Sequence, residues 1–162
     1  MKTELDNTDI KILELLQENS KMTAKQIGER LNLSQTPIFE RIKKLEREGY
    51  IKNYMAVLNE RKLGLKQTVF IGITLKGHTR SYLEKFLIKV SDFPEVLECY
   101  QVAGNYDFIL KVILEDIEGY QVFVETKLSL ISELNTVNSY IAIKKGKQTN
   151  RLDLGFLKNS LK

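Results

Sequence analysis

The sequence predicts an α+β protein, with an N-terminal winged helix-turn-helix followed by a C-terminal ferredoxin-like βαββαβ domain. In the first third of the chain, apolar residues recur at helical spacing in three short, capped segments. Strand-like and helical runs then follow in the order strand, helix, strand, strand, helix, strand. A charged segment with a glycine, residues 59–66, separates the two patterns and predicts a hinge. The predicted domains are therefore 1–58 and 67–162.

Each of the first two predicted helices begins with a capping box, in which a polar side chain and a residue three positions later bond each other's backbone N–H groups. Asp6 and Asp9 open a helix over residues 8–19. Thr23 and Gln26 open the second helix in the same way. Apolar residues at helical spacing predict the buried faces: Ile10, Leu13 and Leu16 in the first helix, Ile27 and Leu31 in the second.

A third helix is predicted between Ser34, its cap, and Gly49, which supplies the left-handed residue that a helix C-terminus favours. Pro37 lies in the first turn, where a missing N–H costs nothing. One narrow stripe of this helix is apolar, and the opposite face is polar and charged. The stripe consists of Ile38, Ile42 and Leu45, and the opposite face of Thr36, Glu40, Lys43 and Arg47.

Two short capped helices joined by a tight polar turn are typical of a DNA-reading helix-turn-helix. Lys and Arg on the exposed face can neutralise phosphates, and polar side chains there can meet base edges. A solvated face on an ordinary helical hairpin has the same composition, so the pattern alone leaves both interpretations open. After Gly49, residues 50–59 alternate between polar and apolar side chains and predict a strand or a wing hairpin.

The second domain is predicted from strands that alternate with helices. Gly104 and Asn105, between two apolar runs, predict a two-residue hairpin turn. Hydrophobic periodicity places the other elements around this turn. They are a strand at 68–75, strands on both sides of the turn within 96–114, helices at 82–90 and 117–131, and a last strand at 137–145.

Both faces of the predicted sheet are apolar, although its two helices can cover only one. On the first strand, Val69, Ile71 and Ile73 point to one side and Phe70 to the other. An antiparallel sheet with one wet face alternates more cleanly than this. We therefore expect the second face to be buried against another copy of the chain, in an isologous dimer.

Bulk composition excludes several classes of protein. With 43% hydrophobic and 28% charged residues, the chain is typical of a soluble globular protein. No apolar run approaches the roughly 20 residues of a membrane span, and the polar N-terminus is unlike a signal peptide, so we expect a cytoplasmic protein. Cys99 is the single cysteine, interpreted as a small buried side chain, and His78 is the single histidine, interpreted as a turn residue. No metal site and no cofactor are therefore expected.

Positive charge is concentrated at the end of the chain. Residues 144–162 contain six Lys or Arg against one Asp, whereas the whole chain has a net charge of +4. Such a tail either attracts phosphates irrespective of sequence or is a solubilising end that packs loosely on the acidic middle of the chain. We favour the second interpretation.

Taken together, these motifs resemble the feast/famine regulators, the family of the leucine-responsive regulator and AsnC in bacteria and archaea. The resemblance covers roughly residues 5–155 and is carried by LDNTDIKILELL, SQTPIFERIKKLEREGYI, KLG, AGNYD and SYIAIKKGKQTN. It implies a transcription factor that binds double-stranded DNA through its helix-turn-helix and senses a free amino acid through its second domain. It also implies homodimers, commonly assembled as octamers of four dimers.

The resemblance assigns the recognition helix to residues 34–47. Ser34 is then expected at a phosphate, Gln35 and Thr36 at base edges, and the cations of the helix at the DNA backbone. The residues expected to contact DNA are Ser34, Gln35, Thr36, Arg41, Lys43 and Lys44, with Lys52 as a weaker candidate.

The resemblance also places the effector at contacts between dimers, near the hairpin turn and the start of the last strand. Asp107 suits the ammonium group of an amino acid, while turn N–H groups and Ser139 suit its carboxylate. An ordinary turn in which Asp107 bonds local backbone explains the same residues. The expected effector residues are Gly104, Asn105, Tyr106, Asp107, Thr136, Val137, Asn138 and Ser139.

Two competing functions belong to other classes. One is a small ferredoxin-like enzyme with an accessory helical domain, and the other is a structural protein that wraps DNA and uses its sheet domain only to oligomerise. An enzyme needs a constellation of His, Cys or paired carboxylates, and none is apparent in the sequence.

Overall fold

The computed structural model describes residues 5–159, which form two compact units. Among these residues, the helical unit comprises 5–57 together with 147–159, and the sheet unit comprises Leu58–Gly146. The sequence assigned residues 67–162 to one domain, whereas the described residues from Lys147 onward belong to the helical unit.

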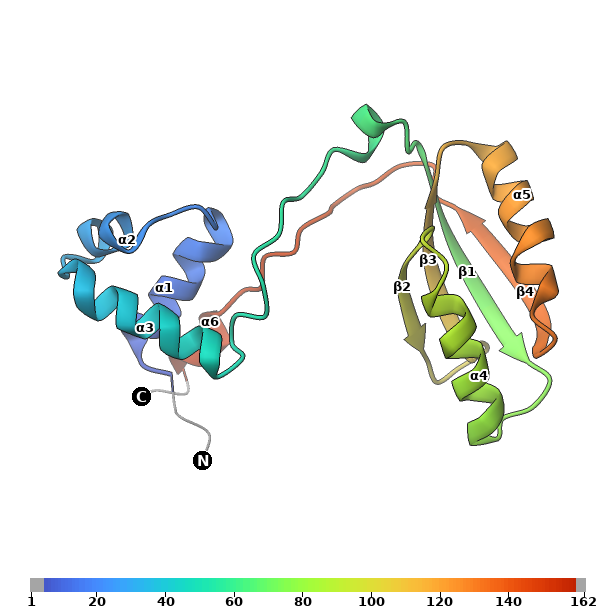
Figure 1. Ribbon diagram of the computed structural model, residues 1–162, viewed down its shortest axis with the longest axis horizontal. Helices are drawn as coiled ribbons and strands as arrows, with labels where there is room; N and C mark the ends of the chain where they lie inside the picture. Colours follow the sequence, from blue (N-terminus) through green and yellow to red (C-terminus); the bar gives the residue numbers. More distant parts are fainter. Residues whose placement is uncertain (1–4, 160–162) are drawn as a thin grey trace. The chain divides into compact units, whose positions relative to one another are not determined.

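The helical unit contains three consecutive helices and a short final one, coloured blue to cyan and red in Figure 1. Both predicted capping boxes are present, since Asp6 accepts from the Asp9 backbone at 2.8 Å and Thr23 accepts from the Gln26 backbone at 3.2 Å. The helices are α1 (Asn7–Glu18), α2 (Ala24–Leu31), α3 (Gln35–Arg47) and α6 (Gly155–Asn159). Their buried core contains Ile12, Leu16, Ile27, Ile38 and Leu45.

The turn between α2 and α3 is fixed by a close approach of backbone to Gly28. Asn32 ends α2 in the left-handed region at φ 55°, and the Leu33 N–H donates to the Gly28 carbonyl at 2.9 Å. A Cβ on Gly28 would lie 2.5 Å from the Leu33 carbonyl oxygen, closer than any real contact. Ser34 occupies the cap position of α3, but its side chain makes no cap hydrogen bond. Glycine at position 28 is therefore what lets α3 follow α2 so closely.

Residues 50–59 do not form the predicted strand or wing hairpin. The segment is extended, but it pairs with no other strand among the residues that the structure describes. Gly49, at φ 78°, ends α3 as predicted, and the Ile51 N–H donates to the Leu45 carbonyl at 3.2 Å. The alternation of polar and apolar side chains in this segment is typical of a strand. A strand also needs a neighbouring strand that forms hydrogen bonds with its backbone, and periodicity does not reveal whether one is present. A short 3-10 helix, η1 (Glu60–Leu63), occupies the predicted hinge.

The C-terminal segment packs on α1 rather than loosely on the acidic middle of the chain. The Gln17 side chain donates to the Leu152 carbonyl at 3.2 Å and accepts from the Leu152 N–H at 2.7 Å. Leu154 is buried, and the Lys158 ammonium lies 2.7 Å from the Glu14 carboxylate. The favoured interpretation of the tail was therefore wrong for its described part, which completes the helical unit.

The sheet unit confirms the ferredoxin-like order of elements. Its four strands are antiparallel neighbours in the order β2-β3-β1-β4, and both helices lie on one face of the sheet (Figure 1). The elements are β1 (Gln67–Leu75), α4 (Arg80–Ser91), β2 (Val96–Gln101), β3 (Phe108–Leu114), α5 (Ile117–Thr126), η2 (Leu128–Leu130) and β4 (Leu134–Ile141).

Two boundaries in the sheet unit differ from the sequence prediction. The helix predicted over 117–131 ends at Thr126, because the backbone of Lys127 leaves the helical region and a separate 3-10 turn follows. The last strand begins three residues earlier and ends four residues earlier than the predicted range, 137–145. Cys99 is half-buried against the core, and burial raises the pKa of its thiol.

The core of the sheet unit lies between the sheet and its two helices. Phe86 of α4 contacts Phe108 of β3, with ring centroids 4.6 Å apart. Phe123 of α5 packs edge-on against Phe93 at 5.8 Å. On β1 the side chains of this face are fully or almost fully buried, namely Val69, Ile71, Ile73 and Leu75.

The opposite face of the sheet, which carries no helix, is rich in aromatic side chains. Phe70 is 41% exposed, and its neighbours across the sheet are Lys111 on β3 and Tyr140 on β4. Lys111 forms an ion pair with Glu98 of β2 at 2.6 Å. We call this surface the open face, defined by Phe70, Glu98, Tyr100, Ile109, Lys111 and Tyr140.

Candidate nucleic-acid interface and effector site

The helix predicted to read DNA presents its polar face to solvent. Ile38 and Leu45 are completely buried on the opposite stripe and anchor α3 in the helical unit. Four of the six predicted DNA-contact residues are exposed, namely Ser34, Gln35, Thr36 and Lys43, as is the weaker candidate Lys52.

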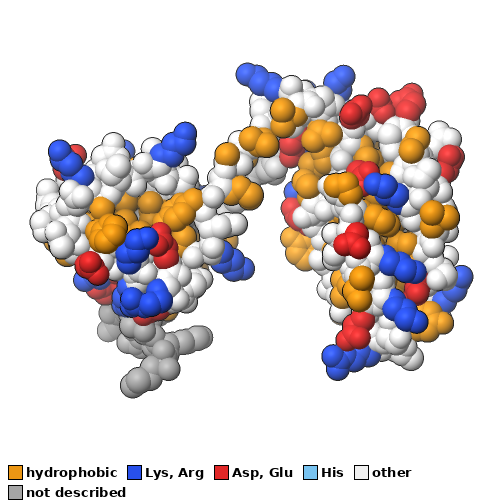
Figure 2. Space-filling view, viewed as in Figure 1, with side chains coloured by type: hydrophobic (Ala, Val, Ile, Leu, Met, Phe, Trp, Pro, Cys, Tyr) orange, Lys and Arg blue, Asp and Glu red, His pale blue; other side chains and the backbone are white. Residues whose placement is uncertain are grey.

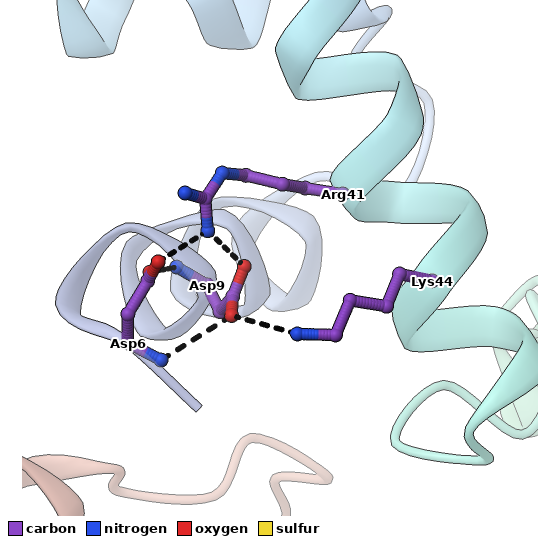
Figure 3. A network of polar contacts seen from close by, with 4 residues as sticks. All are labelled: Asp6, Asp9, Arg41 and Lys44. Carbon is purple, nitrogen blue, oxygen red and sulfur yellow. Dashed lines mark hydrogen bonds and ion pairs between the residues drawn. The ribbon is translucent and has the colours of Figure 1, made fainter. Parts of the chain in front are cut away.

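The other two predicted contacts, Arg41 and Lys44, are turned toward α1 (Figure 3). One guanidinium nitrogen of Arg41 lies 2.5 Å from a carboxylate oxygen of Asp6 and 2.7 Å from one of Asp9. The Lys44 ammonium lies 3.8 Å from the second oxygen of Asp9, and the Asp9 side chain is only 1% exposed. The capping box of α1 thus also holds α3 in place, and Arg41 is engaged in this cluster.

Electrostatics favour the ionised forms of two members of this cluster, Asp6 and Arg41. Hydrogen bonds to Asp9 and Asp6 raise the pKa of the Arg41 guanidinium. Burial raises the pKa of Asp6, but hydrogen bonds from the Asp9 backbone and from Arg41 outweigh it, so the pKa falls below the ordinary 3.8. A lowered carboxyl pKa means that Asp6 stabilises the fold above about pH 4 and loses that contribution on further acidification.

The exposed side of α3 also carries a chain of contacts that periodicity did not reveal. The Lys43 ammonium lies 2.9 Å from Glu46 and 5.7 Å from the centre of the Phe39 ring. The Tyr54 hydroxyl donates to Glu46 at 3.1 Å. Burial, followed by this hydrogen bond, raises the pKa of Tyr54 to about 12. The segment after α3 thereby supports the exposed face of the helix.

Charge on the molecule is mixed in sign. Lys and Arg side chains are interspersed with Asp and Glu on the visible side of each unit (Figure 2). Attraction of a polyanion therefore depends on where particular cations lie rather than on a uniformly basic surface.

The loop predicted to hold the effector is longer than a two-residue hairpin turn. The Val102 N–H donates to the Asp107 carbonyl at 2.9 Å, and this bond encloses residues 103–106. Asp107 is tied to the end of β1, because one carboxylate oxygen accepts from the Leu75 N–H at 2.8 Å. The other oxygen lies 3.0 Å from His78 Nε2, in the loop that follows β1. Both carboxylate oxygens of Asp107 thus already have partners within the chain.

The effector residues on β4 divide between the two faces of the sheet. Val137 and Ser139 lie opposite Ile73 and Ile71 and share their helix-covered face, where the Ser139 hydroxyl bonds that of Tyr120. Thr136 and Asn138 belong to the other face, and the Thr136 hydroxyl lies 2.6 Å from that of Thr74.

Tyr106 joins the loop to the open face. A Cβ on Gly72 would lie 2.7 Å from the Tyr106 ring, so glycine leaves the space that this ring occupies. The Tyr106 hydroxyl bonds that of Tyr140, which raises the pKa of Tyr106. Asn138 lies directly across from Gly72. Tyr106 and Asn138 therefore both lie next to Gly72 of β1.

A pocket between α4 and the turn before β4 is small. It measures about 270 Å³ and is lined by Tyr82, Lys85, Ser132 and Glu133. Ligand pockets are typically about 300 Å³ or larger. Among residues 5–159, no group of three or more His, Cys, Asp or Glu is arranged to hold a metal ion. No helix within that range is long and apolar enough to cross a bilayer.

Family models match both parts of the chain. A winged helix-turn-helix DNA-binding model matches residues 5–52, and a model of the Lrp/AsnC ligand binding domain matches residues 68–152. The chain is 34% identical over 149 residues to the leucine-responsive regulatory protein of Escherichia coli, covering 92% of this chain and 91% of that protein. It is also 34% identical over 141 residues to the Bkd operon transcriptional regulator of Pseudomonas aeruginosa, covering 87% and 92%.

Solved structures are similar over nearly their whole length. A transcriptional regulator of Neisseria meningitidis, crystallised with L-Met, superposes with a TM-score of 0.90 at 33% identity, covering 94% of this chain and 99% of that one. An AsnC family transcriptional regulator of Agrobacterium tumefaciens gives a TM-score of 0.89 at 36% identity, with the same coverage. These relatives are regulators rather than enzymes, which decides against the enzyme alternative.

Proposed function

Because the chain belongs to the Lrp/AsnC family of DNA-binding transcriptional regulators, we propose that it binds a palindromic operator as a dimer and that a free amino acid bound to its sheet unit alters this binding. The observation that carries the DNA-binding part is the exposed polar face of α3, anchored by buried Ile38 and Leu45. As a regulator of genes, the protein acts where the DNA is, in the cytoplasm of a bacterial or archaeal cell.

The proposed DNA contacts follow from side-chain placement on α3. Gln35 and Thr36, exposed in the first turn, are assigned to base edges in the major groove. Ser34, at the N-terminus of α3, and Lys43 are assigned to phosphates, with Lys52 beyond the helix as a further candidate. Arg41 is assigned to the cluster with Asp6 and Asp9, and Lys44 contributes to DNA binding only through its partly exposed ammonium.

Selection of bound fragments from random duplex DNA tests this function. The expected result is enrichment of one palindromic sequence, whose half-sites are about one helical turn or a multiple of it apart. Repeating the selection with a mixture of amino acids tests the effector. Failure to enrich or to retard any duplex at low salt would refute the proposal. Binding without sequence preference, and without any effect of amino acids, would instead favour the DNA-wrapping alternative.

The proposed dimer forms through the open face of the sheet. This face carries Phe70, Tyr100 and Tyr140 at 41–56% exposure, a concentration of aromatic surface that favours burial against a partner. The charges of Glu98 and Lys111 on this face pair with each other within one subunit, so their burial in an interface leaves neither without an opposite charge. The family resemblance adds an octamer of four dimers as the larger assembly.

Phe70→Asp is expected to dissociate this dimer, because it buries a carboxylate in the interface. Sedimentation at micromolar concentration should show a species of at least twice 18.8 kDa for the wild type and of 18.8 kDa for the variant. Leu130→Asp is the matched control, since Leu130 is 75% exposed on η2, away from the open face. A wild-type protein that sediments only at 18.8 kDa would refute the dimer.

The proposed effector is a free amino acid bound near Tyr106 and Asn138, at the edge strand β4, where the rim of the open face can meet a second dimer. Turn N–H groups of residues 104–106 are assigned to the effector carboxylate. Asp107 is assigned to the effector ammonium, which its carboxylate can meet through lone pairs that the Leu75 N–H and His78 leave unused.

Thermal unfolding with each of the common amino acids is expected to identify the effector. A ligand at a hundred times its Kd stabilises the native state by about 2.7 kcal/mol, which raises Tm by several degrees. Asn138→Ala should abolish this shift without lowering the Tm of the free protein, because the side chain is exposed. Asn150→Ala, an exposed residue of the C-terminal segment, should keep it. If Asn138→Ala responds like the wild type, the site lies elsewhere.

A further inference from the structure

We propose that Phe39 of α3 determines DNA sequence specificity by contacting the 5-methyl group of a thymine in the major groove. This inference rests on the proposed function and names a base-reading residue that composition and helix capping did not indicate.

The first observation is where Phe39 lies. Its side chain is 47% exposed, whereas Ile38 beside it and Leu45 on the inner stripe are completely buried. Phe39 follows Thr36 by three positions and precedes Lys43 by four, so the three side chains occupy one exposed face of α3. An aromatic ring thus stands in the middle of the surface that enters the groove in the proposed complex.

The second observation is that the ring is held in place. The Lys43 ammonium lies 5.7 Å from the ring centre, and Glu46 fixes that ammonium at 2.9 Å. Glu46 in turn accepts a hydrogen bond from Tyr54. A side chain with such support loses less freedom on binding than one that moves freely in solvent.

The third observation concerns the charge next to the ring. Glu40 is exposed on the same face and has no ion-pair partner among residues 5–159. A carboxylate is repelled by phosphates but can accept a hydrogen bond from the cytosine N4 amino group. The centre of the α3 face therefore suits base edges, while the exposed Arg47 can extend toward the DNA backbone. In the major groove, the apolar group that a phenyl ring can meet is the thymine methyl.

The test replaces thymines of the selected operator one at a time with deoxyuridine, which lacks only the methyl group. Fluorescence anisotropy then gives Kd for the wild type, Phe39→Ala, Phe39→Leu and Phe156→Ala on each duplex. Phe156, an exposed aromatic residue on α6, serves as the control. We expect one thymine in each half-site at which deoxyuridine weakens wild-type binding about fourfold, the factor for burying one methyl group.

This loss of affinity should disappear in Phe39→Ala and persist in Phe39→Leu and Phe156→Ala. The Tm of Phe39→Ala should equal that of the wild type, because the side chain is exposed. The inference would be overturned if deoxyuridine left the wild-type Kd unchanged at every position, or if the fourfold loss of affinity persisted in Phe39→Ala. Either result would leave the proposed function intact. Failure of the wild type to bind any duplex would instead overturn the proposed function, and this inference with it.

Discussion

Gly28→Ala is expected to abolish sequence-specific DNA binding and to destabilise the helical unit by about 2–3 kcal/mol, the upper range for overpacking. The added Cβ would lie 2.5 Å from the Leu33 carbonyl oxygen, which is backbone and cannot rotate away like a side chain. The turn between α2 and α3 must then open, and the hydrogen bond from the Leu33 N–H to the Gly28 carbonyl is strained. Because this turn sets the direction of α3, operator binding is lost together with stability.

The measurement is Kd for the selected operator, together with urea unfolding followed by circular dichroism. Gly146→Ala is the matched control, since a Cβ there meets nothing within 4 Å. It should change Kd and stability by less than the error of either method. Wild-type affinity for the operator in Gly28→Ala would show that the close approach of Gly28 to Leu33 does not determine how α3 is presented.

Asp9→Ala is expected to lower the free energy of unfolding of the helical unit by about 2–3 kcal/mol. The substitution removes a buried carboxylate that bonds Arg41 at 2.7 Å and accepts from the Asp6 N–H at 3.2 Å. Arg41 keeps only its more exposed partner, Asp6, and the ammonium of Lys44 loses its neighbour. The effect is large because the Asp9 side chain is 1% exposed, so water does not replace the lost contacts.

Urea unfolding at neutral pH measures this loss, and Glu18→Ala is its control. Glu18 pairs with Arg30 at 3.4 Å, but both side chains are 55% exposed, and such pairs contribute about 0–1 kcal/mol. Asp9→Asn should fall between Asp9→Ala and the wild type, because an amide oxygen still accepts from Arg41. Equal stability of Asp9→Ala and Glu18→Ala would refute the structural role of the cluster.

Local signals in the sequence predicted most of the fold. The capping boxes at Asp6 and Thr23 and the left-handed Gly49 involve residues three or fewer positions apart, so their geometry follows from the sequence itself. The order of strands and helices likewise follows from periodicity. The family resemblance, confirmed by matches over both parts of the chain, supplied the function.

Contacts between distant residues explain what the sequence did not predict. Arg41 was assigned to DNA, because nothing local shows that Asp6, 35 positions earlier, holds its guanidinium. The C-terminal segment was assigned to the sheet domain, because its bond to Gln17 spans 135 positions. The periodicity of α3 does not single out Phe39. Its proposed role follows from the exposure of its side chain and from the Lys43 ammonium above its ring.

The packing of α6 on α1 bears on how the chain folds during synthesis. Leu154, buried in the helical unit, leaves the ribosome only after Leu58–Gly146 has been translated. At about 5–20 residues per second, the nascent N-terminal helices wait several seconds for their last partner. The sheet unit therefore has time to fold before the DNA-reading unit receives its last buried side chain.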